Sequence, residues 1–66
     1  MKVYVIEQSF EEKDIAIALS KQEALRLAKQ HMKNEEVDES DMWINEIETG
    51  VIQQEWQGKN IEEVKE

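Results

Sequence analysis

The chain has 66 residues, a formal net charge of −8 and no cysteine. Such a length predicts one domain, over residues 1–66, that buries only roughly 60% of its unfolded surface. Without cysteine it has neither a disulfide nor a thiolate metal site to stabilise it. The acidic balance excludes direct binding to nucleic acid or anionic lipid, and no apolar run is long enough to span a bilayer. We expect a cytoplasmic protein, because cysteine and a signal peptide are both absent.

The charge is distributed unevenly along the chain. Residues 1–33 carry six basic and five acidic side chains, whereas residues 34–66 carry two basic and eleven acidic ones. Acidic side chains of this number keep a small protein soluble. They also suit a protein partner with a basic surface.

Two strands are predicted before any helix. Residues 1–8 (MKVYVIEQ) place apolar side chains on both faces, which is typical of an interior strand. Residues 9–13 are predicted to form a hairpin loop, and residues 14–19 (DIAIAL) a second strand. Ala16 and Ala18 share one face of that strand, where their small side chains allow another element to approach closely.

The helical period is clearest in residues 20–34 (SKQEALRLAKQHMKN). Ser20 and Glu23 have the spacing of a capping box, so the helix should begin there. At about 100° per residue, one side of this helix is mostly apolar, and it consists of Ala24, Leu25, Leu27, Ala28, His31 and Met32. We expect this side, and Leu25, Ala28 and Met32 in particular, to pack on a sheet.

The second half of the chain predicts a hairpin. Residues 34–41 form an acidic connection, and residues 42–48 (MWINEIE) and 51–57 (VIQQEWQ) alternate like strands. Between them, Thr49 and Gly50 have the pattern of a two-residue turn.

This turn fixes which side chains of the hairpin face each other. It places Trp43 opposite Trp56 and Ile47 opposite Ile52, and we predict that this face is buried under the helix because the other face carries acids that cannot be buried unpaired. The face predicted to meet water or a partner consists of Ile44, Glu46, Glu48, Val51, Gln53 and Glu55. From it, together with the first strand, we predict the partner-binding residues Glu46, Glu48, Glu55, Ile44, Val51 and Tyr4.

These elements predict an α+β fold with the order ββαββ. Connection rules favour a four-stranded antiparallel sheet in the order 2-1-3-4 with one helix packed on one face and the other face open. For the tail, residues 58–66, two alternatives remain: Asn60 and Glu63 cap one helical turn, or the segment is frayed.

No constellation predicts catalysis, a metal site or a cofactor. His31 is the only histidine, and neither Ser20 nor Ser40 lies in a nucleophile motif such as G-x-S-x-G. The acids of residues 35–41 lack the ligand spacing and the glycine of a calcium loop. We therefore interpret His31 as a residue at the edge of the apolar side of the helix. The acids of residues 35–41 are interpreted as a solvated loop.

A resemblance to other proteins concerns about half of the chain. MKVYV at the start, and Ile17 to Leu19 leading into Ser20-Lys21-Gln22-Glu23-Ala24, resemble short proteins of bacteria and their phages with an N-terminal β-hairpin followed by an S-x-x-E-A helix. The resemblance implies an origin in a mobile element and assigns no site residue.

Three functions remain as hypotheses. The first is a non-enzymatic acidic protein-binding module, in the form of a phage or mobile-element inhibitor of a host defence protein. The second is a nucleic-acid mimic that blocks a DNA- or RNA-binding groove, and the third is an oligomeric protein that sequesters a small ligand or nucleotide. A small enzyme is less well supported than any of these. Because the core is small and the surfaces are oppositely charged, we also expect self-association as a dimer or higher oligomer.

Overall fold

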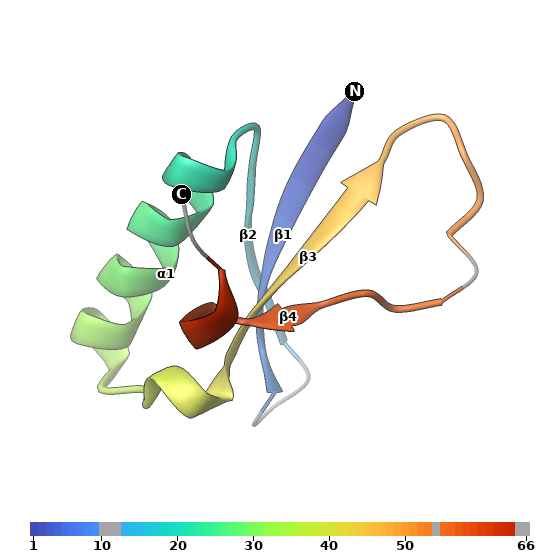
Figure 1. Cartoon of the computed structure of the whole chain (residues 1–66). Helices are drawn as coiled ribbons and strands as arrows, with labels where there is room; N and C mark the ends of the chain where they lie inside the picture. The colour runs from blue at the N-terminus through green and yellow to red at the C-terminus, as the bar shows by residue number, and fades with distance from the viewer. Residues whose placement is uncertain (10–12, 54, 65–66) are drawn as a thin grey trace.

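The computed structural model describes residues 1–9, 13–53 and 55–64. Its elements are β1 (Lys2–Gln8), β2 (Lys13–Ala18), α1 (Lys21–Glu35), the 3-10 helix η2 (Glu39–Asp41), β3 (Met42–Glu48), β4 (Lys59–Asn60) and the 3-10 helix η3 (Ile61–Glu63). The strands form one antiparallel sheet in the order β2-β1-β3-β4, and α1 lies against one of its faces (Figure 1). The predicted α+β fold and strand order are confirmed. Part of the predicted first hairpin loop, residues 10–12, lies outside the described residues.

Local signals determine both ends of α1. The hydroxyl of Ser20 accepts a hydrogen bond of 3.1 Å from the backbone N–H of Glu23, which satisfies one of the free donors of the first turn. At the other end Glu36 adopts a left-handed conformation, with φ 54°, and its N–H bonds to the carbonyl of Met32. The helix predicted for residues 20–34 is confirmed to within a residue or two.

The core lies between α1 and the sheet. Ala18 of β2 is buried in the same cluster as Ala24 and Ala28 of α1. Met32 packs against the cluster from the end of α1. The buried apolar residues are Ile6, Ala18, Ala24, Leu25, Ala28, Met42, Ile44 and Ile61.

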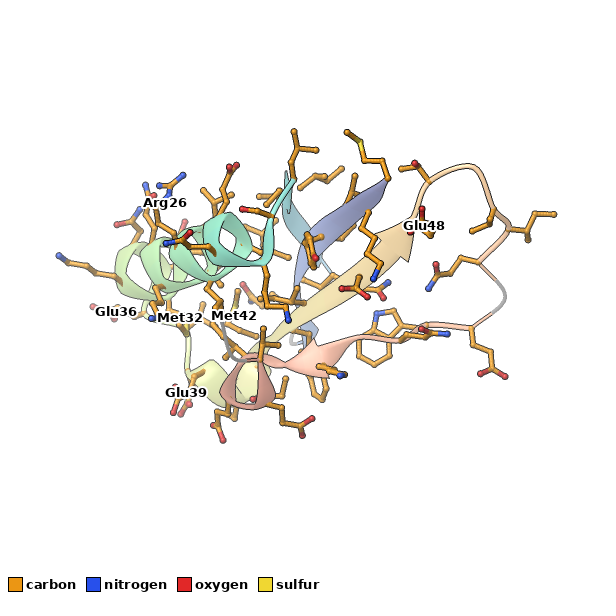
Figure 2. The ribbon with its side chains drawn as sticks, turned by 45° about the horizontal axis from the view of Figure 1, so that its top comes forward. Arg26, Met32, Glu36, Glu39, Met42 and Glu48 are labelled. Carbon is orange, nitrogen blue, oxygen red and sulfur yellow. The ribbon has the colours of Figure 1, made fainter. Side chains whose placement is uncertain are left out.

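The prediction for the buried face of β3 was wrong. Met42 and Ile44 are in the core, whereas Trp43 and Ile47 lie on the opposite face. Figure 2 shows Met42 at the end of β3 beside α1 and Glu48 at the far end, away from it. Because α1 covers only the first half of β3, the acids that follow on the same face are never buried, and they do not oppose this orientation.

The predicted tight hairpin was also wrong. Thr49 and Gly50 form a turn, with φ 85° at Gly50, but the described residues between 51 and 58 form no strand. The partner strand is β4, which pairs Trp43 with Asn60 and Ile44 with Lys59. Residues 49–53 and 55–58 therefore belong to a long connection, which we call the β3–β4 loop and which extends beyond the end of β3 (Figure 1).

Of the two alternatives for the tail, the structure has the capped turn. The side chain of Asn60 accepts a bond of 2.9 Å from the N–H of Glu62 and donates bonds of 3.2 and 3.0 Å to the carbonyls of Glu39 and Ser40. Ile61 is buried against the core. Residues 65–66 of the predicted tail lie outside the described residues.

Candidate functional site

The start of the β3–β4 loop is fastened to the first residue of the chain. The backbone N–H and the hydroxyl of Thr49 both donate to the carbonyl of Met1, at 2.8 and 2.9 Å. Gly50 follows in a conformation that favours glycine, which turns the chain away from the sheet. The loop therefore leaves β3 in a fixed direction.

Two ion pairs lie beside this point. The N-terminal ammonium group is 2.8 Å from Glu48 Oε1, and Lys2 Nζ is 3.5 Å from Glu46 Oε2. The hydrogen bond from the ammonium group, followed by its charge, lowers the pKa of Glu48 from its usual 4.5, against a small opposing effect of burial. Both carboxylates remain about half exposed, so these pairs orient the acids more than they stabilise the fold.

The end of the loop is held on the open face of the sheet, which we define as the face opposite α1. There the indoles of Trp43 and Trp56 meet with their ring centroids 5.4 Å apart and their planes at 60°. Trp56 Nε1 also donates a bond of 2.9 Å to Glu7 Oε1. The predicted meeting of the two tryptophans is thus correct, but it comes from the fold of the loop and not from a hairpin register.

Gly58 makes room for this arrangement. A Cβ atom at Gly58 would overlap the ring of Trp56, so only glycine allows the indole to lie against the backbone here. Trp43 Nε1 and the oxygen of Asn45, which is only 6% exposed, are buried without a partner among the described residues. Burying these two polar atoms without a hydrogen-bond partner costs stability.

Between its two fixed ends the loop exposes a pair of apolar side chains. Val51 is 62% exposed and Ile52 is 88% exposed. A bond of 3.0 Å from Gln53 Nε2 to the carbonyl of Glu55 orders the backbone that follows. An open hollow of about 470 Å³ lies here, lined by Lys2, Glu46, Glu48, Val51, Ile52, Gln53, Glu55 and Gln57.

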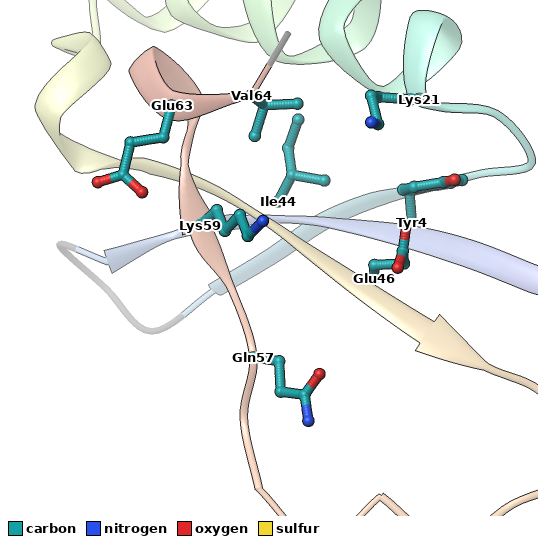
Figure 3. A pocket seen from close by; sticks show the side chains of 8 residues that line it. All are labelled: Tyr4, Lys21, Ile44, Glu46, Gln57, Lys59, Glu63 and Val64. Atoms are coloured by element: carbon teal, nitrogen blue, oxygen red, sulfur yellow. The ribbon is translucent and has the colours of Figure 1, made fainter. Parts of the chain in front are cut away.

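A second cleft of about 380 Å³ adjoins the hollow and shares Glu46 and Gln57 with it. Its wall is drawn from four parts of the chain: the first turn of α1, the sheet, Gln57 at the end of the β3–β4 loop and the C-terminal segment (Figure 3). Lys21 and Lys59 line it together with Glu46 and Glu63, so its charges are mixed. This cleft is less acidic than the hollow beside it.

The structure brings most of the predicted partner-binding residues together. Glu46, Glu48, Val51 and Glu55 line the hollow, although two of them were predicted from a strand that does not exist. Ile44 was a wrong prediction, because it is buried in the core, and Tyr4 is half buried and packs against the core at the edge of the second cleft.

Ile52 was missed. Ile52 was predicted to lie under the helix, but it is the most exposed large apolar side chain of the described residues. If residues 51–57 form a loop and not a strand, Ile52 has no apolar side chain opposite it. This is the feature of the sequence that could have indicated its exposure.

The side chains considered for catalysis have structural roles. Ser20 caps α1, and a bond of 2.8 Å joins His31 Nε2 to Gln8 Oε1 at the edge of the core. Asp38, one of the acids of the predicted solvated loop, caps η2 by accepting from the N–H of Ser40 at 3.1 Å. Within the described ranges there is no group of three or more side chains that could hold a metal ion.

In the part of the chain that the structure describes, no helix has the length and apolar character needed to cross a membrane. The acidic hollow lies beside the exposed apolar pair of the β3–β4 loop. No family model, no curated protein and no solved structure matches the chain.

Proposed function

We propose that this chain is a non-enzymatic protein-binding module and that the β3–β4 loop is its binding surface. The observation that carries the proposal is the exposure of Val51 and Ile52 on a loop that is held at both ends. Loops presented by a rigid scaffold are the usual place for binding residues. Covering an isoleucine that is 88% exposed contributes about 1.5–3 kcal/mol to the free energy of binding.

The anchoring of the loop favours binding. A free loop must lose conformational entropy when it binds, which costs about 0.5–1.5 kcal/mol for each immobilised side chain. Here the bonds from Thr49 to Met1 and from Trp56 to Glu7 hold both ends of the loop beforehand. Less of the affinity gained by burying the apolar pair is therefore lost to ordering the loop.

The acids around the apolar pair indicate the chemistry of the partner. Glu46, Glu48 and Glu55 line the same hollow as Ile52, so the partner should offer an apolar pocket with a basic rim. Glu46 and Glu48 already pair with Lys2 and the N-terminal ammonium group. Glu55 has no ion pair among the described residues, so it is the acid most available to the partner.

The form proposed for this module is an inhibitor of a host protein, such as a defence protein. The resemblance of the N-terminal half to short proteins of bacteria and their phages supports that form. The proposal makes no use of a catalytic group, because the hydroxyl of Ser20 and the ring of His31 are both engaged in structural hydrogen bonds.

Capture from a bacterial lysate with matched variants tests the proposal. We expect the immobilised protein to retain a specific partner and Ile52→Asp to lower its capture about tenfold, because the side chain at the centre of the interface becomes charged. Leu19→Asp makes the same change at an exposed leucine outside the loop and should capture the partner normally. Equal capture by the wild type and Ile52→Asp would contradict the proposed surface.

The same experiment separates this function from a nucleic-acid mimic. A mimic should capture a nucleic-acid-binding protein, release it to competing DNA or RNA, and weaken steeply as salt is raised. The proposed interface depends on Ile52 and should weaken only moderately, since salt screens its rim and not its apolar centre.

A further inference from the structure

The strand β2 forms one outer edge of the sheet. Within the described residues its neighbour is β1, with the register Tyr4 to Ala18, Val5 to Ile17 and Ile6 to Ala16. Among the described residues, none of the backbone hydrogen bonds outside helices and strand ladders involves β2. Because successive backbone groups of a strand point to alternate sides, half of those in β2 face away from the sheet.

The side chains in the second half of β2 do not block pairing, whereas the first half begins with the charged residues Lys13 and Asp14. Natural edge strands are usually protected by charges, proline or a bulge, yet residues 15–19 (IAIAL) contain no charge and no proline. The pairing of β1 with β2 shifts between Ile6 and Glu7, whose partners are Ala16 and Asp14, so the extra residue is Ile15 of β2. This bulge lies in the first half of β2 and leaves the ladder from Ala16 to Ala18 regular. Ile17 and Leu19 are 67% and 66% exposed.

We propose that β2 pairs antiparallel with the β2 strand of a second copy of this chain. Such a pair has two-fold symmetry, with each copy contributing the same surface. The two four-stranded sheets then join into one continuous sheet with both copies of α1 on the same face. The other, open faces become continuous, which places the exposed Ile17 of each copy next to the apolar side chains of its partner.

The distribution of charge favours a second copy as the occupant of this edge. β2 belongs to the half of the chain with six basic and five acidic side chains, while β3, β4 and the β3–β4 loop belong to the half with two basic and eleven acidic ones. In the joined sheet the two β4 strands are seven strand spacings apart, or about 34 Å. At physiological salt the screening length is about 8 Å, so the two acidic halves barely repel.

The opposite edge does not offer the same pairing. β4 has only two residues and leads directly into η3, and pairing there would bring the two acidic halves together. The dimer therefore leaves both copies of the β3–β4 loop free at its far ends. The paired edge contains no residue of the β3–β4 loop, since β2 forms one outer edge of the sheet and the loop joins the two strands at the other.

Sedimentation over a wide range of protein concentration tests the dimer. We expect the mass to rise with concentration from the 7.8 kDa of one chain towards that of two. Ile17→Lys and Ile17→Glu should each weaken association at least about tenfold, because like charges then meet across the new ladder. Circular dichroism checks that both variants keep the fold, which the exposure of Ile17 favours.

An experiment that mixes these two variants tests the pairing most directly. An equimolar mixture of Ile17→Lys and Ile17→Glu should form a heterodimer, since opposite charges replace like charges across the two-fold axis. Ile52→Lys, which changes an even more exposed isoleucine in the β3–β4 loop, is the control and should dimerise as the wild type does. Amides of β2 that face away from β1 should also exchange hydrogen more slowly as the protein concentration rises.

Several results would overturn the inference. These are a wild-type mass of one chain at every concentration, a mixture that stays monomeric, or association that is lost in Ile52→Lys and kept in Ile17→Lys. None of them bears on the capture of a partner by the loop, so failure of the dimer and failure of the proposed function are distinguishable.

Discussion

Gly58 determines where the indole of Trp56 lies. The ring occupies the space that a side chain at Gly58 would need, and from there it reaches both Trp43 and Glu7. The other glycine, Gly50, has open space around it and is required only for its positive φ. The two glycines of the chain therefore serve different purposes, one steric and one conformational.

Gly58→Ala should separate the two tryptophans. The added methyl group displaces the half-exposed indole of Trp56, which loses its contact with Trp43 at a cost of about 1 kcal/mol. The measurement is the exciton signal of the indole pair in circular dichroism, which should vanish while the far-ultraviolet spectrum is kept.

Gly50→Ala is the matched control for that substitution. It should lower stability through strain at φ 85° and leave the indole signal in place. An unchanged signal in Gly58→Ala would show that the indole does not depend on this glycine.

At the scale of the element, α1 is where local sequence and packing agree best. Its cap and the spacing of its apolar side chains are both properties of neighbouring residues, so they can be predicted without knowing the fold. Leu25 lies at the centre of the apolar side and is buried against the sheet.

Replacing Leu25 with Ala should lower the free energy of unfolding by about 2–5 kcal/mol. The removed side chain leaves a cavity in a core of only a few large residues. Leu19→Ala, at an exposed leucine just before α1, should change it by less than about 0.5 kcal/mol. Urea denaturation measures both variants, and equal stability of the two would contradict the packing of α1.

The second half of the fold could be predicted only in part, because its order depends on distant contacts. The turn at Thr49 and Gly50 forms as its local pattern predicts, but the chain does not return at once. The position of β4 is instead set by the bonds of Asn60 to the η2 segment and by the burial of Ile61. Neither contact leaves a periodic signal in residues 51–57, whose alternation predicted a strand.

The faces of β3 illustrate the same limit. In a strand buried along its whole length, Glu46 and Glu48 would exclude their face from the core. In the structure only Met42 and Ile44 lie under α1, and the acids continue beyond it. A strand can thus change from buried to exposed along one face, and alternation alone does not reveal where this happens.

At the scale of the whole molecule, charge and position are linked by the topology. The strand order places the nearly neutral half of the chain at the β2 edge and the acidic half at the β4 edge. The pair between Glu48 and the N-terminal ammonium group joins the first residue of the nearly neutral half to an acid of the other half, and it lowers the pKa of that carboxyl.

Glu48→Gln should reveal how much this ion pair contributes to the free energy of unfolding. A carboxyl whose pKa is lower in the folded than in the unfolded state stabilises the fold fully above the unfolded value, here about 4.5, and loses that effect as the pH falls through the folded value. The difference in free energy of unfolding between the wild type and Glu48→Gln should therefore be largest above pH 4.5 and shrink in more acidic solution. Denaturation at a series of pH values measures it.

The N-terminal ammonium group supplies the control for this prediction. In an NMR titration the carboxyl of Glu48 should have its midpoint below 4.5, because the ammonium group donates to it at 2.8 Å and attracts its charge. Acetylation of the N-terminus removes that charge and should move the midpoint back towards 4.5. A midpoint that is the same before and after acetylation would mean that the ammonium group does not hold Glu48, and the fixed direction in which the β3–β4 loop leaves the sheet would then rest only on the bonds from Thr49 to the carbonyl of Met1.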